Sequence, residues 1–481
     1  MKLRTFSTPR DSMNRRGFLA KVAGLATMAS IYAEAQGVQT PGNLRARVPD
    51  PGQIPGQTPT APTSNAALLK PSDFRYLGAM RVPEEISAFS YGGMTARTVN
   101  GRLQFFMVGE NSPNATANWG SFEPVWEFAD TQSYNEDYTQ APRATVLTKW
   151  GDIYQGRRKS FDSSGKAISL QYLLTRGLLW KNNRLYWNFY DTYNVTSRPD
   201  WHIGMTDLKS GPGSMVAYGP WRANVGVKHG SYWIVDMPDG TMGIGSGFTS
   251  GNIASSWGPE LWSGSPFPSD NTPSGYGAPD LNFSKHYVGY EFAGNDLASD
   301  GSLLPGRTLK SLQREGTYVW HQQGTVVDVD PQKNGGIGSF TDIDYVHSCA
   351  YINLPDKQGL LFAGSLGTGH VWYGNTTNCG HGFGNPCGGG QGPNASAFKS
   401  QFWIYDPAQC ARVVAGQTAP NLVPAYAFDP TTIHPLQMGC SKGFGGIHFD
   451  VASRNLYIAA YQADVSTAGY PLPLIHVFHI N

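Results

Sequence analysis

The sequence has few charged side chains, and the two signs are nearly balanced. Asp, Glu, Lys and Arg make up 15% of its 481 residues, and the formal net charge at pH 7 is +1. Nucleic acid binding requires clustered Lys and Arg to neutralise phosphates, so the composition argues against a nucleic acid partner. It gives no sign of a basic membrane-binding surface either.

Long apolar runs and familiar catalytic motifs are also missing. No stretch of about 20 apolar residues could cross a bilayer, so no membrane span is expected. The chain contains no Gly-x-Ser-x-Gly elbow, no His-Glu-x-x-His and no phosphate-binding loop. No motif therefore identifies a reaction, and candidate sites must come from fold and residue chemistry.

Residues 1–35 have the organisation of a signal peptide: a charged region, a short apolar run and an Ala-x-Ala site. They resemble a twin-arginine (Tat) signal, and the matching residues are Arg15, Arg16, Phe18 and Leu19. An ordinary secretory signal is the alternative. We expect cleavage after Ala35 and a periplasmic or extracellular protein. Tat clients fold before export and often carry a metal or cofactor, so the resemblance raises the expectation of a bound metal.

Residues 36–68 are predicted to be a disordered linker. This segment contains six prolines and hardly any large apolar residue, so it cannot bury enough surface to fold. We expect one folded domain over residues 69–481.

The rest of the chain is predicted to be all-β. It is rich in Gly (58 in the whole chain), Tyr (24) and Trp (13), and it shows few patterns of long charged helices. Related strand–turn–strand units recur along it, with hairpin turns such as Asn-Asn and Pro-Asp-Gly. These units are residues 92–106, 177–190, 231–247, 349–365 and 445–459.

Hairpins spread along a long chain, with similar units near both ends, favour a β-propeller over a β-sandwich or two all-β domains. We expect Phe74–Pro83 to close the ring by pairing with Pro473–Asn481. At about 40–60 residues per blade, the length predicts six to eight blades, most simply seven.

The chain also resembles secreted β-propellers of uncharacterised type. The resemblance rests on "FRYLGAMRVP" and "FSYGGM" near the start, "WIYDP", and "GGIHFDVASRNLYIAAYQAD" and "LIHVFHI" at the end. It implies the fold and no particular activity.

All five cysteines lie in the last third of the chain. Cys379 and Cys387 flank a glycine-rich loop, and in an oxidising compartment a disulfide between them is the first expectation. The alternative is a transition metal such as zinc or copper, held by these cysteines with His381 and His370.

Three groups of residues are candidates for catalysis or ligand binding. Arg314, Tyr318 and His321 could neutralise a uronate carboxylate and move a proton, as a polysaccharide lyase requires. Asp342, Asp344 and His347 could hold a divalent metal or provide acid–base catalysis at a glycosidic bond. His229, Tyr232 and Trp233 form a candidate ligand-binding group, because sugars stack on aromatic rings.

These candidates lead to three hypotheses. The first is an exported propeller that cleaves envelope or extracellular polysaccharide as a lyase or glycosidase. The second is a non-catalytic propeller that binds a saccharide or a protein. The third is a periplasmic oxidoreductase with a bound metal. The first hypothesis predicts that its titratable residues converge around the ring axis.

Overall fold

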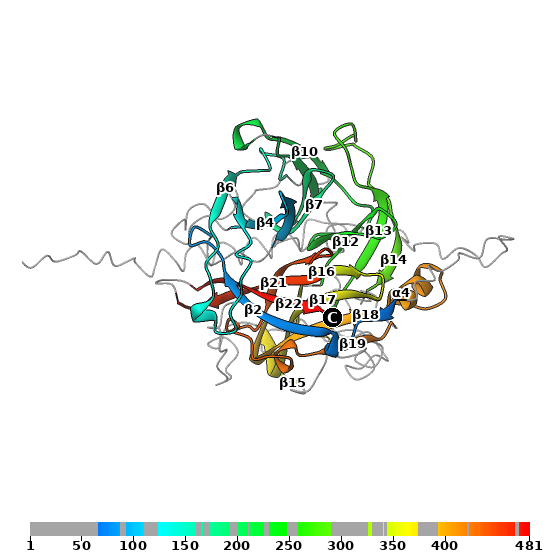
Figure 1. Ribbon diagram of the computed structural model, residues 1–481. Helices are drawn as coiled ribbons and strands as arrows, with labels where there is room; N and C mark the ends of the chain where they lie inside the picture. Colours follow the sequence, from blue (N-terminus) through cyan, green and yellow to red (C-terminus); the bar gives the residue numbers. More distant parts are fainter. Residues whose placement is uncertain are drawn as a thin grey trace, which may run out of the picture. The chain divides into compact units, whose positions relative to one another are not determined.

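The computed structural model describes residues 66–86, 93–109, 124–159, 165–166, 173–191, 201–209, 211–225, 230–247, 258–289, 326–329, 340, 344–373, 393–420, 423–466 and 471–481. They belong to one compact unit, Thr60–Asn481. Their strands form five β-sheets (Figure 1). Within this part of the chain, no helix has the length and hydropathy needed to cross a membrane.

Three sheets each consist of four antiparallel strands that follow one another in the sequence. The first contains β3 (Met94–Val99), β4 (Arg102–Val108), β5 (Val125–Ala129) and β6 (Val146–Gly151). The second contains β7 (Leu173–Lys181), β8 (Arg184–Asp191), β9 (Ile203–Asp207) and β10 (Val216–Trp221). The third contains β11 (Trp233–Asp236), β12 (Thr241–Gly245), β13 (Leu261–Pro266) and β14 (Phe283–Val288).

The other two sheets include strands from the start of the domain. The fourth contains β16 (Tyr345–Asn353), β17 (Lys357–Tyr373), β18 (Pro393–Tyr405) and β19 (Ala425–Phe428), with β1 (Ala67–Leu68) and β15 (Val326–Val329) paired to β17. The fifth contains β20 (Phe444–Asp450), β21 (Asn455–Asp464), β22 (Leu472–Ile480) and β2 (Phe74–Arg81). The helix α4 (Pro407–Val414) follows β18, and Asp406 caps it by accepting a hydrogen bond from the Ala408 N–H at 2.8 Å.

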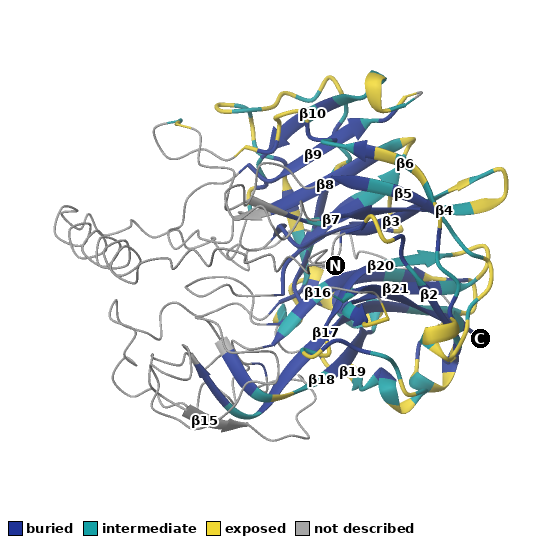
Figure 2. Ribbon diagram, turned by 90° about the vertical axis from the view of Figure 1, so that its left-hand side faces the viewer, coloured by how far each residue is buried: buried dark blue, intermediate teal, exposed yellow. Residues whose placement is uncertain are grey.

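The sheets pack face to face in a ring. Five large hydrophobic clusters each lie between two neighbouring sheets, and the last joins the fifth sheet to the first. There Phe105 meets Tyr457 with ring centroids 4.9 Å apart. The innermost strands β3, β7, β11, β16 and β20 contact one another in the same cyclic order. The described residues therefore form a five-bladed β-propeller, with buried strands and exposed turns (Figure 2).

The prediction of an all-β propeller is confirmed, but the prediction of seven blades is not: the described sheets number five. Successive innermost strands begin about 60 to about 110 residues apart, and all but the shortest spacing exceed the roughly 40–60 residues expected for a blade. Dividing the length by a typical blade size therefore overestimated the number. The five repeated units found in the sequence each supply the two innermost strands of one blade.

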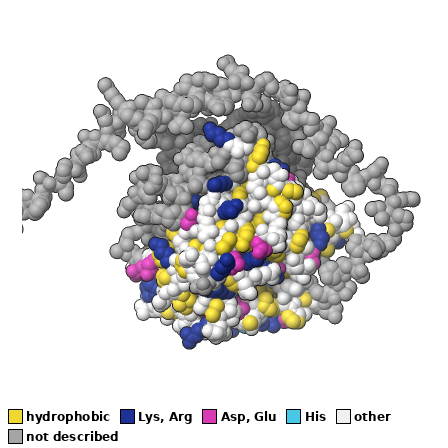
Figure 3. Space-filling model, turned by 90° about the horizontal axis from the view of Figure 1, so that it is seen from above, with side chains coloured by type: hydrophobic (Ala, Val, Ile, Leu, Met, Phe, Trp, Pro, Cys, Tyr) yellow, Lys and Arg dark blue, Asp and Glu magenta, His cyan; other side chains and the backbone are white. Residues whose placement is uncertain are grey.

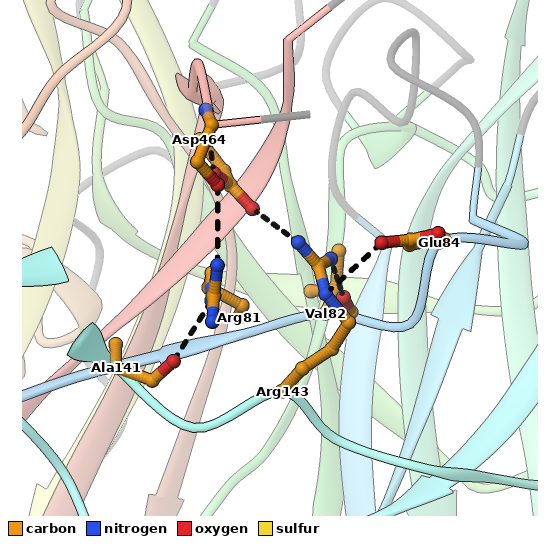
Figure 4. Close-up of polar contacts among 7 residues, drawn as sticks. Arg81, Val82, Glu84, Ala141, Arg143 and Asp464 are labelled. Carbon is orange, nitrogen blue, oxygen red and sulfur yellow. Dashed lines mark hydrogen bonds and ion pairs between the residues drawn. The ribbon is translucent and has the colours of Figure 1, made fainter. Parts of the chain in front are cut away.

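The predicted ring closure is confirmed. β2 pairs antiparallel with β22, from Phe74 opposite Ile480 to Arg81 opposite Leu474. A polar cluster at the end of β2 ties this blade to the first one (Figure 4). The buried Asp464 carboxylate pairs with Arg143 at 3.2 Å and accepts from Ser466, whose Oγ also accepts from Arg81 Nη1 at 3.2 Å.

Arg143 further donates to the carbonyl of Val82 at 2.7 Å, and Arg81 donates through Nε to the carbonyl of Ala141 at 2.8 Å (Figure 4). Every charge in the cluster has an opposite charge or a hydrogen-bond acceptor, as burial of ions requires. The cluster therefore stabilises the junction at which the two ends of the folded domain meet.

The hairpin turns follow from local chemistry. Asn100 and Gly101, and likewise Asn182 and Asn183, all have positive φ, which a two-residue turn between twisted strands requires. Asn and Gly tolerate this conformation best. On the face seen in Figure 3, Lys and Arg side chains are interspersed with Asp and Glu among the described residues.

Candidate functional site

A small cavity lies where the five innermost strands meet. Its volume is about 20 Å³, room for one water-sized group. Every innermost strand, or the residue just before it, contributes to its lining. The lining consists of Met94, Arg176, Gly177, Leu178, Tyr232, Trp233, Ile234, His347, Ser348, Cys349, Gly446 and Ile447. We call it the axial cavity.

Three of the five innermost strands are irregular at the axial cavity. Their pairing register shifts at Arg176 in β7, at His347 in β16 and at Gly445 and Gly446 in β20. A β-bulge adds a residue without a partner opposite it and redirects its side chain, and bulges are frequent next to active sites. Here the bulges coincide with the cavity lining, and two of them present a titratable side chain.

Asn188 of β8 supports the bulge in β7. Its side chain is fully buried and uses both ends of its amide. Oδ1 accepts from the Gly177 N–H at 2.8 Å, and Nδ2 donates to the carbonyls of Gly230 and Trp233, both at 3.1 Å. A Cβ on Gly177 would lie 2.4 Å from Asn188 Oδ1, so the contact requires glycine. Asn188 therefore fixes the second blade against the third beside Arg176.

Aromatic rings surround His347. The Tyr232 ring is stacked on the imidazole with centroids 6.0 Å apart and an angle of 23°. The rings of Tyr345 and Tyr461 lie 5.5 Å and 5.7 Å away. The Arg176 guanidinium lies over the Tyr232 ring, with Cζ 5.9 Å from its centroid. Three blades thus bring a cation, a phenol and an imidazole together at the axis.

The imidazole of His347 is neutral. Burial and the positive charge of Arg176 lower its pKa to about 3. Its Nδ1 lies 3.2 Å from the carbonyl oxygen of Phe444. A carbonyl can only accept, so Nδ1 carries the proton and Nε2 is the basic nitrogen. His347 is therefore a hydrogen-bond acceptor at Nε2 and only a weak base.

The axial cavity brings together two residues from different predicted groups, Tyr232 and His347. Trp233 also lines it, but its side chain is buried in the core and packs edge-on against Phe362 at 5.5 Å. Asp344 is buried just before β16, where its Oδ1 accepts from the Gly367 N–H at 2.9 Å.

His370 lies on β17, where its backbone N–H donates to Ser396 Oγ at 2.9 Å. It does not line the axial cavity. The remaining candidates lie outside the described residues: Arg314, Tyr318, His321, Asp342, His229, Cys379, Cys387 and His381. In the described part of the chain, no three His, Cys, Asp or Glu side chains form a group that could hold a metal. Cys349 and Cys410 are buried free thiols.

Arg176 was not among the site residues predicted from the sequence, although one feature of the sequence points to it. It is the one charged side chain in the apolar strand sequence "LLTRGLLW", and glycine follows it. An isolated glycine within a strand pattern suggests a bulge. The same reasoning applies to Gly445 and Gly446 in β20.

No family model and no curated protein sequence matches the chain. Solved structures similar to it include a glycosyl hydrolase from Bacteroides ovatus, with a TM-score of 0.34 and 11% identity over 84% of this chain and 93% of that one. A putative glycoside hydrolase from Parabacteroides distasonis aligns with a TM-score of 0.36 and 11% identity over 86% and 95%. A family-43 β-xylosidase/α-arabinofuranosidase from a compost metagenome aligns with a TM-score of 0.36 and 11% identity over 84% and 94%. Similarity this low transfers neither residues nor activity to this chain.

Proposed function

We propose that this protein cleaves an acidic polysaccharide, and that Arg176, Tyr232 and His347 bind and process one of its uronate units. The observation that carries the proposal is the meeting of these side chains, from three blades, at one axial cavity. Arginine is the residue best suited to hold a carboxylate. The cavity has room for one oxygen of such a carboxylate, while the rest of the uronate unit would remain outside it.

The chemistry that fits these residues is β-elimination. Arg176 would bind the uronate carboxylate and stabilise the negative charge that develops when the C5 proton leaves. Tyr232, ionised beside the Arg176 cation, would take that proton, and the electron pair left at C5 would form the C4=C5 double bond as the C4–O bond breaks. The Tyr232 phenol would then return the proton to the departing oxygen. His347 is too weak a base for the first step, so its proposed part is to accept a hydrogen bond from the sugar at Nε2.

The test is the activity of Arg176→Gln towards polyuronates, followed by the ultraviolet absorbance of the unsaturated product. We expect kcat/KM to fall about 100-fold or more, with partial recovery in Arg176→Lys. The matched control is Arg184→Gln on β8, which removes a cation that pairs with Asp270 at 3.4 Å and does not line the cavity. Unchanged turnover in Arg176→Gln, made by active protein, would contradict the proposal.

A second candidate is a propeller that binds the saccharide without cleaving it. The low pKa of His347 favours this alternative, because it removes one general base from the cavity. Hydrolysis by paired carboxylates is not favoured, since the described lining contains neither Asp nor Glu. Binding of a polyuronate that depends on Arg176, with no product formed by the wild type, would establish the second candidate.

We further propose that the protein works outside the cytoplasm, after Tat export and cleavage behind Ala35. The arginine pair and the Ala-x-Ala site of residues 1–35 support this location. The test is the N-terminal residue of the periplasmic or secreted protein, expected to be Gln36. Replacing Arg15 and Arg16 together by Lys should retain the precursor in the cytoplasm; undiminished export would contradict the Tat route.

A further inference from the structure

A second and larger cavity, of about 330 Å³, lies farther along the innermost strands, towards their hairpin turns. We call it the hairpin-end cavity. Four side chains line both cavities: Leu178, Ile234, Cys349 and Ile447. The two cavities therefore follow one another along the axis and are separated by a mainly apolar layer. A volume of this size is at the lower end of the range for small-molecule sites.

One wall of the hairpin-end cavity contains a carboxylate. Asp236, the last residue of β11, accepts a hydrogen bond at Oδ2 from Lys181 Nζ at 2.5 Å. Its side chain is 39% exposed, whereas its Oδ1 is buried, so Oδ2 is the carboxylate oxygen that faces the cavity. A carboxylate oxygen accepts more than one hydrogen bond, so Oδ2 can also accept from an O–H or N–H group of a ligand.

The charges at this wall are balanced, which restricts the class of ligand. Lys181 neutralises Asp236, and burial lowers the pKa of His448 to about 4, so its imidazole carries no charge at neutral pH. Neither a cationic nor an anionic ligand would gain a net Coulomb attraction. A neutral donor of hydrogen bonds fits the wall best.

The other walls are apolar or aromatic. They include Trp180, Tyr351 and Phe449, together with the aliphatic side chains shared with the axial cavity. A sugar ring has hydroxyl groups at its edge and apolar C–H groups on its faces, and such faces pack on aromatic side chains. A single pyranose or pentose unit also matches the size of the cavity.

We propose that the hairpin-end cavity binds a neutral monosaccharide unit, one hydroxyl of which donates to Asp236 Oδ2. This site is separate from the axial cavity and holds whether or not the protein cleaves uronates. Trp180 and Phe449 would pack against the faces of the sugar ring.

The experiment is titration calorimetry of the full-length mature protein with D-glucose and D-xylose, supported by Trp fluorescence. We expect millimolar binding of at least one sugar, and a loss of about tenfold or more in affinity in Asp236→Asn. The matched control is Asp239→Asn in the same hairpin, which removes an exposed pair with Lys285 at 2.6 Å outside the cavity. Asp239→Asn and Arg176→Gln should both bind the sugar as the wild type does.

Three results would overturn the inference: no binding of either sugar by the wild type, equal affinity in Asp236→Asn, or equal losses in Asp236→Asn and Asp239→Asn. Tighter binding of a cationic amine such as choline than of either sugar would overturn it as well. Because Arg176→Gln tests the axial cavity alone, failure of the uronate proposal and failure of this one are distinguishable.

Discussion

The two ends of the propeller axis differ in how regular their strands are. At the axial cavity, β7, β16 and β20 contain bulges, and the side chains of Arg176 and His347 are placed by them. Towards the hairpin turns the same strands pair without interruption, and aliphatic and aromatic side chains dominate. A regular strand alternates between two faces, and each bulge interrupts that alternation by one residue, which is Arg176 in β7 and His347 in β16.

Deleting single residues from β7 is the strongest test of this difference between the bulged and the regular end of the strands. Removing Arg176 eliminates the extra residue and leaves the pairs on either side intact, so the protein should fold with a loss of stability of only about 1 kcal/mol. Removing Leu178 from the regular part removes a core side chain and shifts the following residues to the wrong faces. We expect that deletion to cost more than about 4 kcal/mol or to abolish folding.

Urea unfolding and soluble yield measure both deletions. If the Arg176 deletion is as damaging as the Leu178 deletion, the bulge is needed for folding and is not a device for placing a side chain.

Asn188→Ala tests whether the Asn188 side chain stabilises the bulge in β7. This change leaves the Gly177 N–H and the carbonyls of Gly230 and Trp233 without their partner in the interior, and we expect a loss of about 3 kcal/mol in the free energy of unfolding. Asn224→Ala is the matched control, because the Asn224 amide also bridges two segments, but at an exposed position. It should cost about 1 kcal/mol or less. Similar losses in the two variants would contradict the role given to Asn188.

Both ends hold a half-buried histidine with a neutral imidazole, and this similarity predicts how stability depends on pH. The pKa values of His347 and His448 fall to about 3 and about 4 in the folded protein, whereas an unfolded histidine titrates near about 6.5. Between these values the unfolded state binds more protons. The stability that each neutral histidine contributes is therefore complete above pH 6.5 and is lost as the pH falls towards the folded pKa.

For each histidine we expect a loss of about 2 kcal/mol between pH 7 and pH 5. His347→Gln and His448→Gln should each flatten the pH dependence measured by urea unfolding at a series of pH values. A variant with the wild-type slope would show that its histidine is protonated, or already exposed, in the folded protein.

The smallest expected effect concerns Cys349 and Cys410, the free thiols among the described residues. Cys349 lines both cavities, and Cys410 lies on α4. Burial raises the pKa of Cys410 to about 12 and the pKa of Cys349 well above its usual value. We expect neither thiol to react with iodoacetamide at pH 8 in the folded protein, and both to react after denaturation. Mass spectrometry of the alkylated peptides checks this. Alkylation of Cys349 alone would show that a cavity opens to solvent.

The sequence by itself determined the local parts of this protein. Asn-Gly and Asn-Asn pairs specify two-residue turns in the first two inner hairpins, and Pro-Asp-Gly marks the turn of the third. Ring closure predicted the pairing of Phe74–Pro83 with Pro473–Asn481, near the two ends of the folded domain. Tyr232 and His347 were chosen because of their chemistry, without a reason why they should meet.

Only the tertiary structure decided the number of blades and the composition of the axial cavity. Blade number depends on which sheets pack against each other, and the long connections between strands made length a poor guide. A bulge is a relation between two paired strands, so the side chain it redirects cannot be identified from one strand alone. Arg176, Tyr232 and His347 lie far apart in the chain, and packing of the second, third and fourth blades around one axis brings them together.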